Sequence, residues 1–148
     1  MKEDIQSRAD IDDLMNRFYA RAMSDDVIGY IFTDVARLDL ENHLPVIGDF
    51  WETLLFGTGS YQRHGRNPMQ IHARLNLETL LRAEHFRRWL KIFRETVDES
   101  FVGERAELAK TRAEMIANRI RNFISEVPAI QHGQQDNFCA VGSGGTKL

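Results

Sequence analysis

Residues 66–77, RNPMQIHARLNL, carry the clearest helix start in the chain. Asn67 can cap the first free backbone N–H groups of a helix, and Pro68 suits the first helical position, where its missing N–H costs nothing. The stretch therefore predicts a helix of roughly two turns that carries a single imidazole, His72. The surroundings of this imidazole depend on the helices that the rest of the chain can form.

Other stretches repeat apolar residues at spacings of three and four, which is the period of amphipathic helices. The apolar stripes run over 11–22, 40–55, 86–97 and 109–127. Asp10 is the expected N-cap of the first of these helices. The second carries His43 on its apolar side and ends at Gly57, and we expect Pro45 within its first turn, where proline is tolerated. No stretch alternates with the period of two that half-buried strands require, so the fold class is all-α.

Two segments between and after these helices are polar. Residues 57–68, GTGSYQRHGRNP, are typical of an exposed loop. Pro128 ends the last helix, and residues 128–148 have the composition of a flexible polar tail. The chain is thus expected to form one domain over 1–127 followed by that tail. Cys139 lies in the tail without a nearby histidine partner, which argues against a nucleophilic role.

The composition excludes several classes of partner. The net charge is −3, with 43% hydrophobic and 28% charged residues, so no overall field would attract nucleic acid or an anionic membrane. One cysteine cannot form an intrachain disulfide, which fits a reducing compartment. The first residues lack the apolar segment of a signal peptide, and no run reaches the roughly 20 apolar residues that cross a bilayer. We therefore expect a cytoplasmic protein without nucleic-acid or membrane partners.

The usual signatures of protein-only catalysis are missing from the sequence. There is no Gly-rich phosphate loop, no CxxC pair, no HExxH motif and no GxSxG elbow. The histidines also lack the short spacings of a closed zinc site. Large apolar residues punctuated by Tyr, His and Trp instead favour a helical pocket for a flat, apolar cofactor that brings its own reactivity.

Six segments occur in the order and approximate spacing of the truncated haemoglobins, and the chain most resembles their group III. They are FYARAM (18–23), GYIF (29–32), HLPVIGDFW (43–51), GTGSY (57–61), NPMQIHARL (67–75) and HFRRWLKIF (85–93). The resemblance extends over about 11–127. Groups I and II usually carry Gly-Gly pairs near their early helices, whereas the Gly-Gly pair of this chain is Gly144–Gly145 in the tail.

The resemblance implies a globin-like two-over-two helical sandwich around haem b, iron protoporphyrin IX. His72 would be the proximal ligand of the iron, with its second ring nitrogen bonded to a backbone carbonyl near Pro68 or Met69. Tyr19 and Trp89 would face the distal side and donate hydrogen bonds to the bound gas. His43 would stand at the distal histidine position, where it could donate to the ligand, gate the pocket or point to solvent. The apolar walls would be Phe32, Ile47, Phe50 and Trp51, and the haem-edge cations would come from Arg66, Arg74, Arg63 and His64.

Three features depart from the family pattern. Pro45 follows His43 closely, Asn76 stands where relatives often have proline, and the loop SYQRHGRNP (60–68) is somewhat long. These departures concern the pocket entrance and the contacts at the haem edge, and they leave His72 unaffected.

The implied function is binding of O2, NO or CO at pentacoordinate ferrous iron by a monomer or weak oligomer. Several distal donors would slow O2 release, which suits oxygen or nitric oxide chemistry, such as NO dioxygenation, or peroxide reduction, better than bulk oxygen transport. Any turnover would need an external reductase, because the chain has no flavin or nicotinamide motif. Two alternatives remain at this point. In one, the chain is a cofactor-free helical interaction module in which His72 and Trp89 are packing residues. In the other, it is a haem sensor.

Overall fold

The computed structural model describes residues 1–126, so the expected tail at 128–148, with Cys139, lies outside the described residues. The chain forms seven helical segments in this range. They are α1 (Arg8–Met23), the π-helical η1 (Ile31–Val35), α2 (Leu40–Phe56), the 3-10 helix η2 (Ser60–His64), α3 (Pro68–Glu78), α4 (Ala83–Ser100) and α5 (Glu104–Glu126). No strand forms within 1–126, where Glu3 and Phe101 make an isolated β-bridge. The all-α prediction is confirmed.

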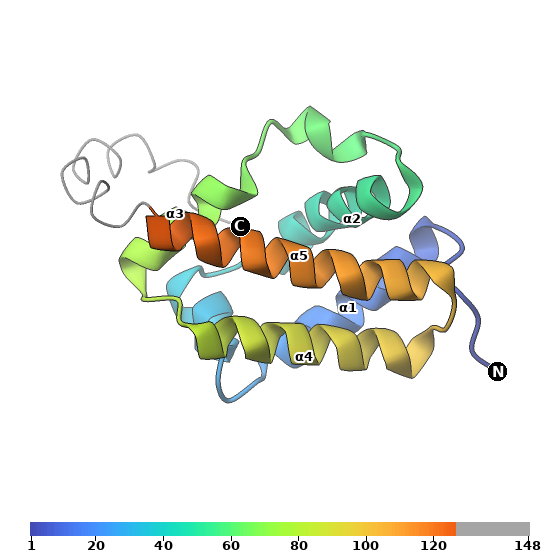
Figure 1. Cartoon of the computed structure of the whole chain (residues 1–148), viewed down its shortest axis with the longest axis horizontal. Coiled ribbons are helices and arrows are strands. Elements are labelled where there is room, and N and C mark those ends of the chain that lie inside the picture. Colours follow the sequence, from blue (N-terminus) through green and yellow to red (C-terminus); the bar gives the residue numbers. More distant parts are fainter. Residues whose placement is uncertain (127–148) are drawn as a thin grey trace.

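The long helices form two layers. The helix α1 packs on α2, and α4 packs on α5, while α1 also contacts α4 and α2 contacts α5. Figure 1 shows α4 and α5 side by side in front of α1 and α2. The short helix α3 packs mainly on α5. This arrangement is the two-over-two sandwich that the resemblance implied.

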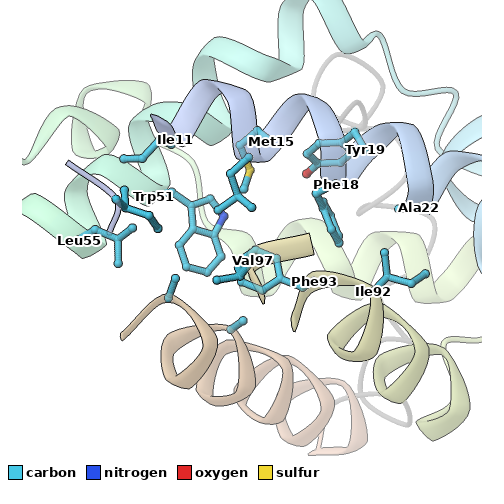
Figure 2. Packing of buried hydrophobic residues seen from close by; sticks show 14 of the residues in the cluster. Ile11, Met15, Phe18, Tyr19, Ala22, Trp51, Leu55, Ile92, Phe93 and Val97 are labelled. Atoms are coloured by element: carbon cyan, nitrogen blue, oxygen red, sulfur yellow. The ribbon is translucent and has the colours of Figure 1, made fainter. Parts of the chain in front are cut away.

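The core lies where the two layers meet. Phe18 of α1 and Phe93 of α4 are fully buried there, and Trp51 of α2 is only 3% exposed. Figure 2 shows their side chains meeting between the helices. Burying one such side chain stabilises a fold by about 1.5–3 kcal/mol. On α5 the buried residues include Ala106, Ala109 and Ala113, whose small side chains let α4 and α5 approach closely.

The start of α1 and the position of Pro45 within α2 differ from the sequence prediction. Ser7, not Asp10, is the N-cap residue of α1, and Asp10 lies in the first turn, where its Oδ2 accepts a hydrogen bond from the backbone N–H of Gln6 at 2.8 Å. The N-cap predicted from the apolar stripe was wrong because the first turn of α1 is polar and lies outside that stripe. Pro45 is the sixth residue of a helix that begins at Leu40, so it lies in the second turn and not the first.

Two shorter segments also differ. The helix α3 has 11 residues, which is about three turns and not two. The predicted loop at 57–68 contains η2, and Ser60 within it is buried. The Oγ atom of Ser60 lies 3.2 Å from a carboxylate oxygen of Glu52, so a polar residue is tied onto α2 and not left in solvent. None of the helices in the described part of the chain has the length and apolar character that crossing a membrane requires.

Candidate functional site

His72 is held in place by the start of α3 at Asn67 and Pro68. The Oδ1 atom of Asn67 accepts hydrogen bonds from the N–H groups of Met69 and Gln70, at 3.0 and 3.4 Å, and Pro68 occupies the first turn. One turn further on, Nδ1 of His72 lies 2.7 Å from the carbonyl oxygen of Pro68. The expected backbone partner of His72 is therefore confirmed.

This bond fixes the chemistry of the imidazole. A carbonyl oxygen can only accept, so Nδ1 of His72 carries the hydrogen and Nε2 keeps its lone pair. Burial lowers the pKa of His72, and the bond to Pro68 opposes that effect without cancelling it. His72 is thus a neutral imidazole with an available lone pair, which is the form that binds a metal ion.

His72 lines a cavity of about 180 Å³ to which all five α-helices contribute. Apolar and aromatic side chains form most of its wall. They include the four predicted wall residues Phe32, Ile47, Phe50 and Trp51, together with Leu75, Phe86 and Ile116. A mostly apolar cavity with a few polar groups is typical of a cofactor site.

Two polar side chains from α1 and α2 meet in the wall of this cavity. The Oη atom of Tyr19 lies 2.8 Å from Nε2 of His43, and both residues are at most 9% exposed. Burial raises the pKa of Tyr19, so the phenol stays protonated at physiological pH. Whether Tyr19 or His43 donates in this bond depends on the tautomer of His43.

The third predicted distal residue, Trp89, is fixed by aromatic neighbours. Its ring stacks on Phe93, with centroids 5.5 Å apart and planes inclined by 16°, and Phe93 in turn stacks on Trp51 at 4.9 Å. Phe18 meets Trp89 edge-on at 5.7 Å. These contacts hold the indole on the cavity wall, so the structure brings Tyr19, His43, His72 and Trp89 together around one space.

Comparisons with known proteins identify the family of this chain. Residues 2–124 match the family model of the bacterial-like globins. A group 3 truncated hemoglobin, ctb, of Campylobacter jejuni is 31% identical over 127 residues, which cover 84% of this chain and 95% of that protein. The chain belongs to the group III truncated haemoglobins. The crystal structure of the group III truncated hemoglobin from Campylobacter jejuni has a TM-score of 0.71 with it, at 29% identity and with the same coverage of both chains.

As a truncated haemoglobin, the protein binds haem and small gaseous ligands. The cavity residues fit that cofactor. The flat porphyrin needs apolar walls, and iron needs a neutral imidazole with a free lone pair, which His72 supplies. The cofactor-free interaction module considered from the sequence is thereby set aside.

The residues predicted as haem-edge cations lie at different places in this truncated haemoglobin, and one of them lines the cavity. Arg66 lines the cavity, whereas Arg63, His64 and Arg74 are not among its lining residues. Nε2 of His64 instead lies 2.8 Å from Oδ2 of Asp49. That carboxylate also accepts from Arg8 at 2.6 Å, so His64 belongs to an ionic cluster on the surface of α1 and α2.

Two polar lining residues were missed from the sequence. Tyr61 belongs to η2, within the predicted exposed loop, and partial burial raises its pKa. His85 lies in the first turn of α4, and the histidine spacing that argues against a zinc site does not reveal its place on the cavity wall. Its position four residues before Trp89 could have revealed it, because residues at i and i+4 share a helix face.

Proposed function

We propose that this truncated haemoglobin binds haem b through Nε2 of His72 and stabilises a gas ligand with hydrogen bonds from Tyr19 and Trp89, with His43 acting through the hydroxyl of Tyr19. The bond from Nδ1 of His72 to the carbonyl of Pro68 carries the proposal, because it leaves Nε2 as a ligand atom on the wall of an apolar cavity. Bound there, haem supplies an iron atom that binds O2, NO and CO.

The walls would hold the porphyrin by apolar contact. Phe32, Ile47, Phe50 and Trp51 would cover its faces and interior edges, where contact with water is excluded. Arg66 is the cation proposed at the haem edge. Arg74 is left out of this role, because it is not among the residues lining the cavity.

Tyr19 and His43 would act as one unit toward the gas ligand. Since burial raises the pKa of Tyr19, its hydroxyl keeps its hydrogen. When Nε2–H of His43 donates to Oη of Tyr19, the phenol hydrogen is available to a ligand in the cavity. Trp89 also lines the cavity, and its indole N–H would be a further donor to the ligand.

Such donors favour retention of ligand over its rapid release. We therefore propose that the protein works in oxygen or nitric oxide chemistry, such as NO dioxygenation, or in peroxide reduction, and not in bulk oxygen transport. An external reductase would supply the electrons, since the chain carries no flavin or nicotinamide motif. The cytoplasm, where such reductants are found, is the proposed location.

Spectra of the ferrous protein under nitrogen, O2, CO and NO test the proposal. With haem bound, the protein under nitrogen should be pentacoordinate, and each gas should shift its Soret band. The His72→Ala variant should lose this normal spectrum, whereas the control His64→Ala, at a histidine that does not line the cavity, should keep it. An unchanged spectrum in His72→Ala would rule out His72 as the ligand.

A further inference from the structure

We propose that His85 binds a carboxylate of the haem by donating a hydrogen bond from Nε2. The inference rests on the proposed haem b, which carries two carboxylates, and it gives a role to a residue to which the family resemblance assigned none. Three observations carry it: the place of His85 on the cavity wall, the backbone bond that fixes its tautomer, and its position in the first turn of α4.

His85 stands at the rim of the cavity. It shares a face of α4 with Trp89, one turn further along, and both line the cavity. Phe93, a further turn on, is fully buried, whereas His85 is only partly buried. The ring of His85 meets that of Tyr30 edge-on at 6.2 Å, and Tyr30 is 40% exposed. This face of α4 therefore leads from the interior outward to His85.

A backbone bond fixes which nitrogen of His85 carries hydrogen. The backbone N–H of Arg82 donates to Nδ1 of His85 at 3.0 Å. Because a backbone N–H can only donate, Nδ1 holds its lone pair and the neutral ring carries its hydrogen on Nε2. This is the reverse of His72, whose Nδ1–H donates to a carbonyl. While the bond to Arg82 lasts, His85 is a hydrogen-bond donor and not a second ligand for iron.

A haem carboxylate is the acceptor that suits such a donor. The porphyrin body is apolar and belongs between the aromatic walls, but its carboxylates are costly to bury and must stay at the rim. A hydrogen bond to a carboxylate is stronger than one between neutral groups. His85 also lies in the first turn of an 18-residue helix, whose N-terminal end favours negative charge.

Two variants at His85, whose new side chains have nearly the same shape as each other, test the inference. Gln and Glu at this position can both accept from the N-cap backbone, as in a capping box, so both preserve the start of α4. His85→Gln keeps a donor toward the carboxylate, whereas His85→Glu places a negative charge there. The measurement is the rate of haem loss from the holoprotein to excess apomyoglobin, with protohaem and with its dimethyl ester, which has no carboxylates.

His85→Glu should lose protohaem about tenfold faster than His85→Gln. His85→Gln should stay close to the unmodified protein, and the gap between the two variants should disappear with the dimethyl ester. Equal rates for the two variants with protohaem, or an equal gap with both haems, would overturn the inference. The Soret band of each variant reports ligation by His72 separately, so failure of the proposed haem site would be recognised before any rate is compared.

Discussion

At the residue scale, the backbone partners of two histidines on one cavity wall give them opposite chemistry. The carbonyl of Pro68 makes His72 a lone-pair donor at Nε2, and the N–H of Arg82 makes His85 a hydrogen donor at Nε2. His43 differs from both, because its Nε2 is bonded to the hydroxyl of Tyr19. The role of each imidazole thus follows from the group that faces it and not from its residue type.

Changing Tyr19 to Phe should speed the dissociation of O2. The hydroxyl is the only polar atom removed, and a hydrogen bond of this kind to a partly charged ligand is worth about 1.5–3 kcal/mol, or roughly 10–150-fold in rate. Stopped-flow displacement of O2 by CO measures the effect. The matched control is Tyr30→Phe, at a tyrosine that is 40% exposed and does not line the cavity, where the rate should not change. An unaltered rate in Tyr19→Phe would remove Tyr19 from the mechanism.

At the element scale, the sequence predicted the helices better than their ends. Apolar stripes mark a buried face, so α2 and α4 were placed within a few residues. The apolar stripe does not extend over the polar first turn of α1, so the predicted start of α1 lies after the observed one. The π-helical η1 and the left-handed Arg37 after it, at a φ of 49°, have no local sequence signal. The period of an apolar stripe does not predict such conformations.

The start of α3 offers a direct test at this scale. Asn67→Ala removes the side chain that caps the N–H groups of Met69 and Gln70, and it should lower the free energy of unfolding by about 1 kcal/mol. Because α3 carries His72, haem loss should also become faster. Urea unfolding of the apoprotein measures the first effect. Asn67→Asp keeps an acceptor at the cap and should stay close to the unmodified protein, so equal losses in both variants would contradict the capping role.

At the scale of the whole molecule, contacts between distant segments set the site. The stack from Trp89 through Phe93 to Trp51 joins α4 to α2, and the bond from Tyr19 to His43 joins α1 to α2. Periodicity predicts that these residues are buried but cannot predict which of them meet. Their expected grouping around one cavity came from the family resemblance, which carries information about tertiary structure that a single stripe lacks.

Asp25 supplies another such long-range contact, between α4 and the turn after α1. Its Oδ1 accepts from Nε and Nη2 of Arg88, at 2.9 and 2.7 Å, and its Oδ2 accepts from the N–H groups of Val27 and Ile28. The side chain of Asp25 is only 7% exposed. The bonds from Arg88 are the main reason that the pKa of Asp25 lies below its usual value. This carboxylate therefore ties the turn that leads into η1 to the helix that carries Trp89.

Asp25→Asn should weaken the interaction with Arg88 and so cause a pH-dependent loss of stability. At pH 7 the variant should lose about 1–2 kcal/mol of unfolding free energy, a range reduced because Arg88 is partly exposed. Since the folded pKa lies below the unfolded value, the charge stabilises the fold above about pH 4, and this contribution is lost as the pH falls further. The gap between Asp25→Asn and the unmodified protein in urea unfolding should therefore narrow below pH ~4. The control Asp26→Asn makes the same charge change at an exposed neighbour. An equal loss of unfolding free energy in Asp26→Asn would show that the ion pair with Arg88 does not hold the two segments together. A difference between Asp25→Asn and the unmodified protein that does not change with pH would show the same.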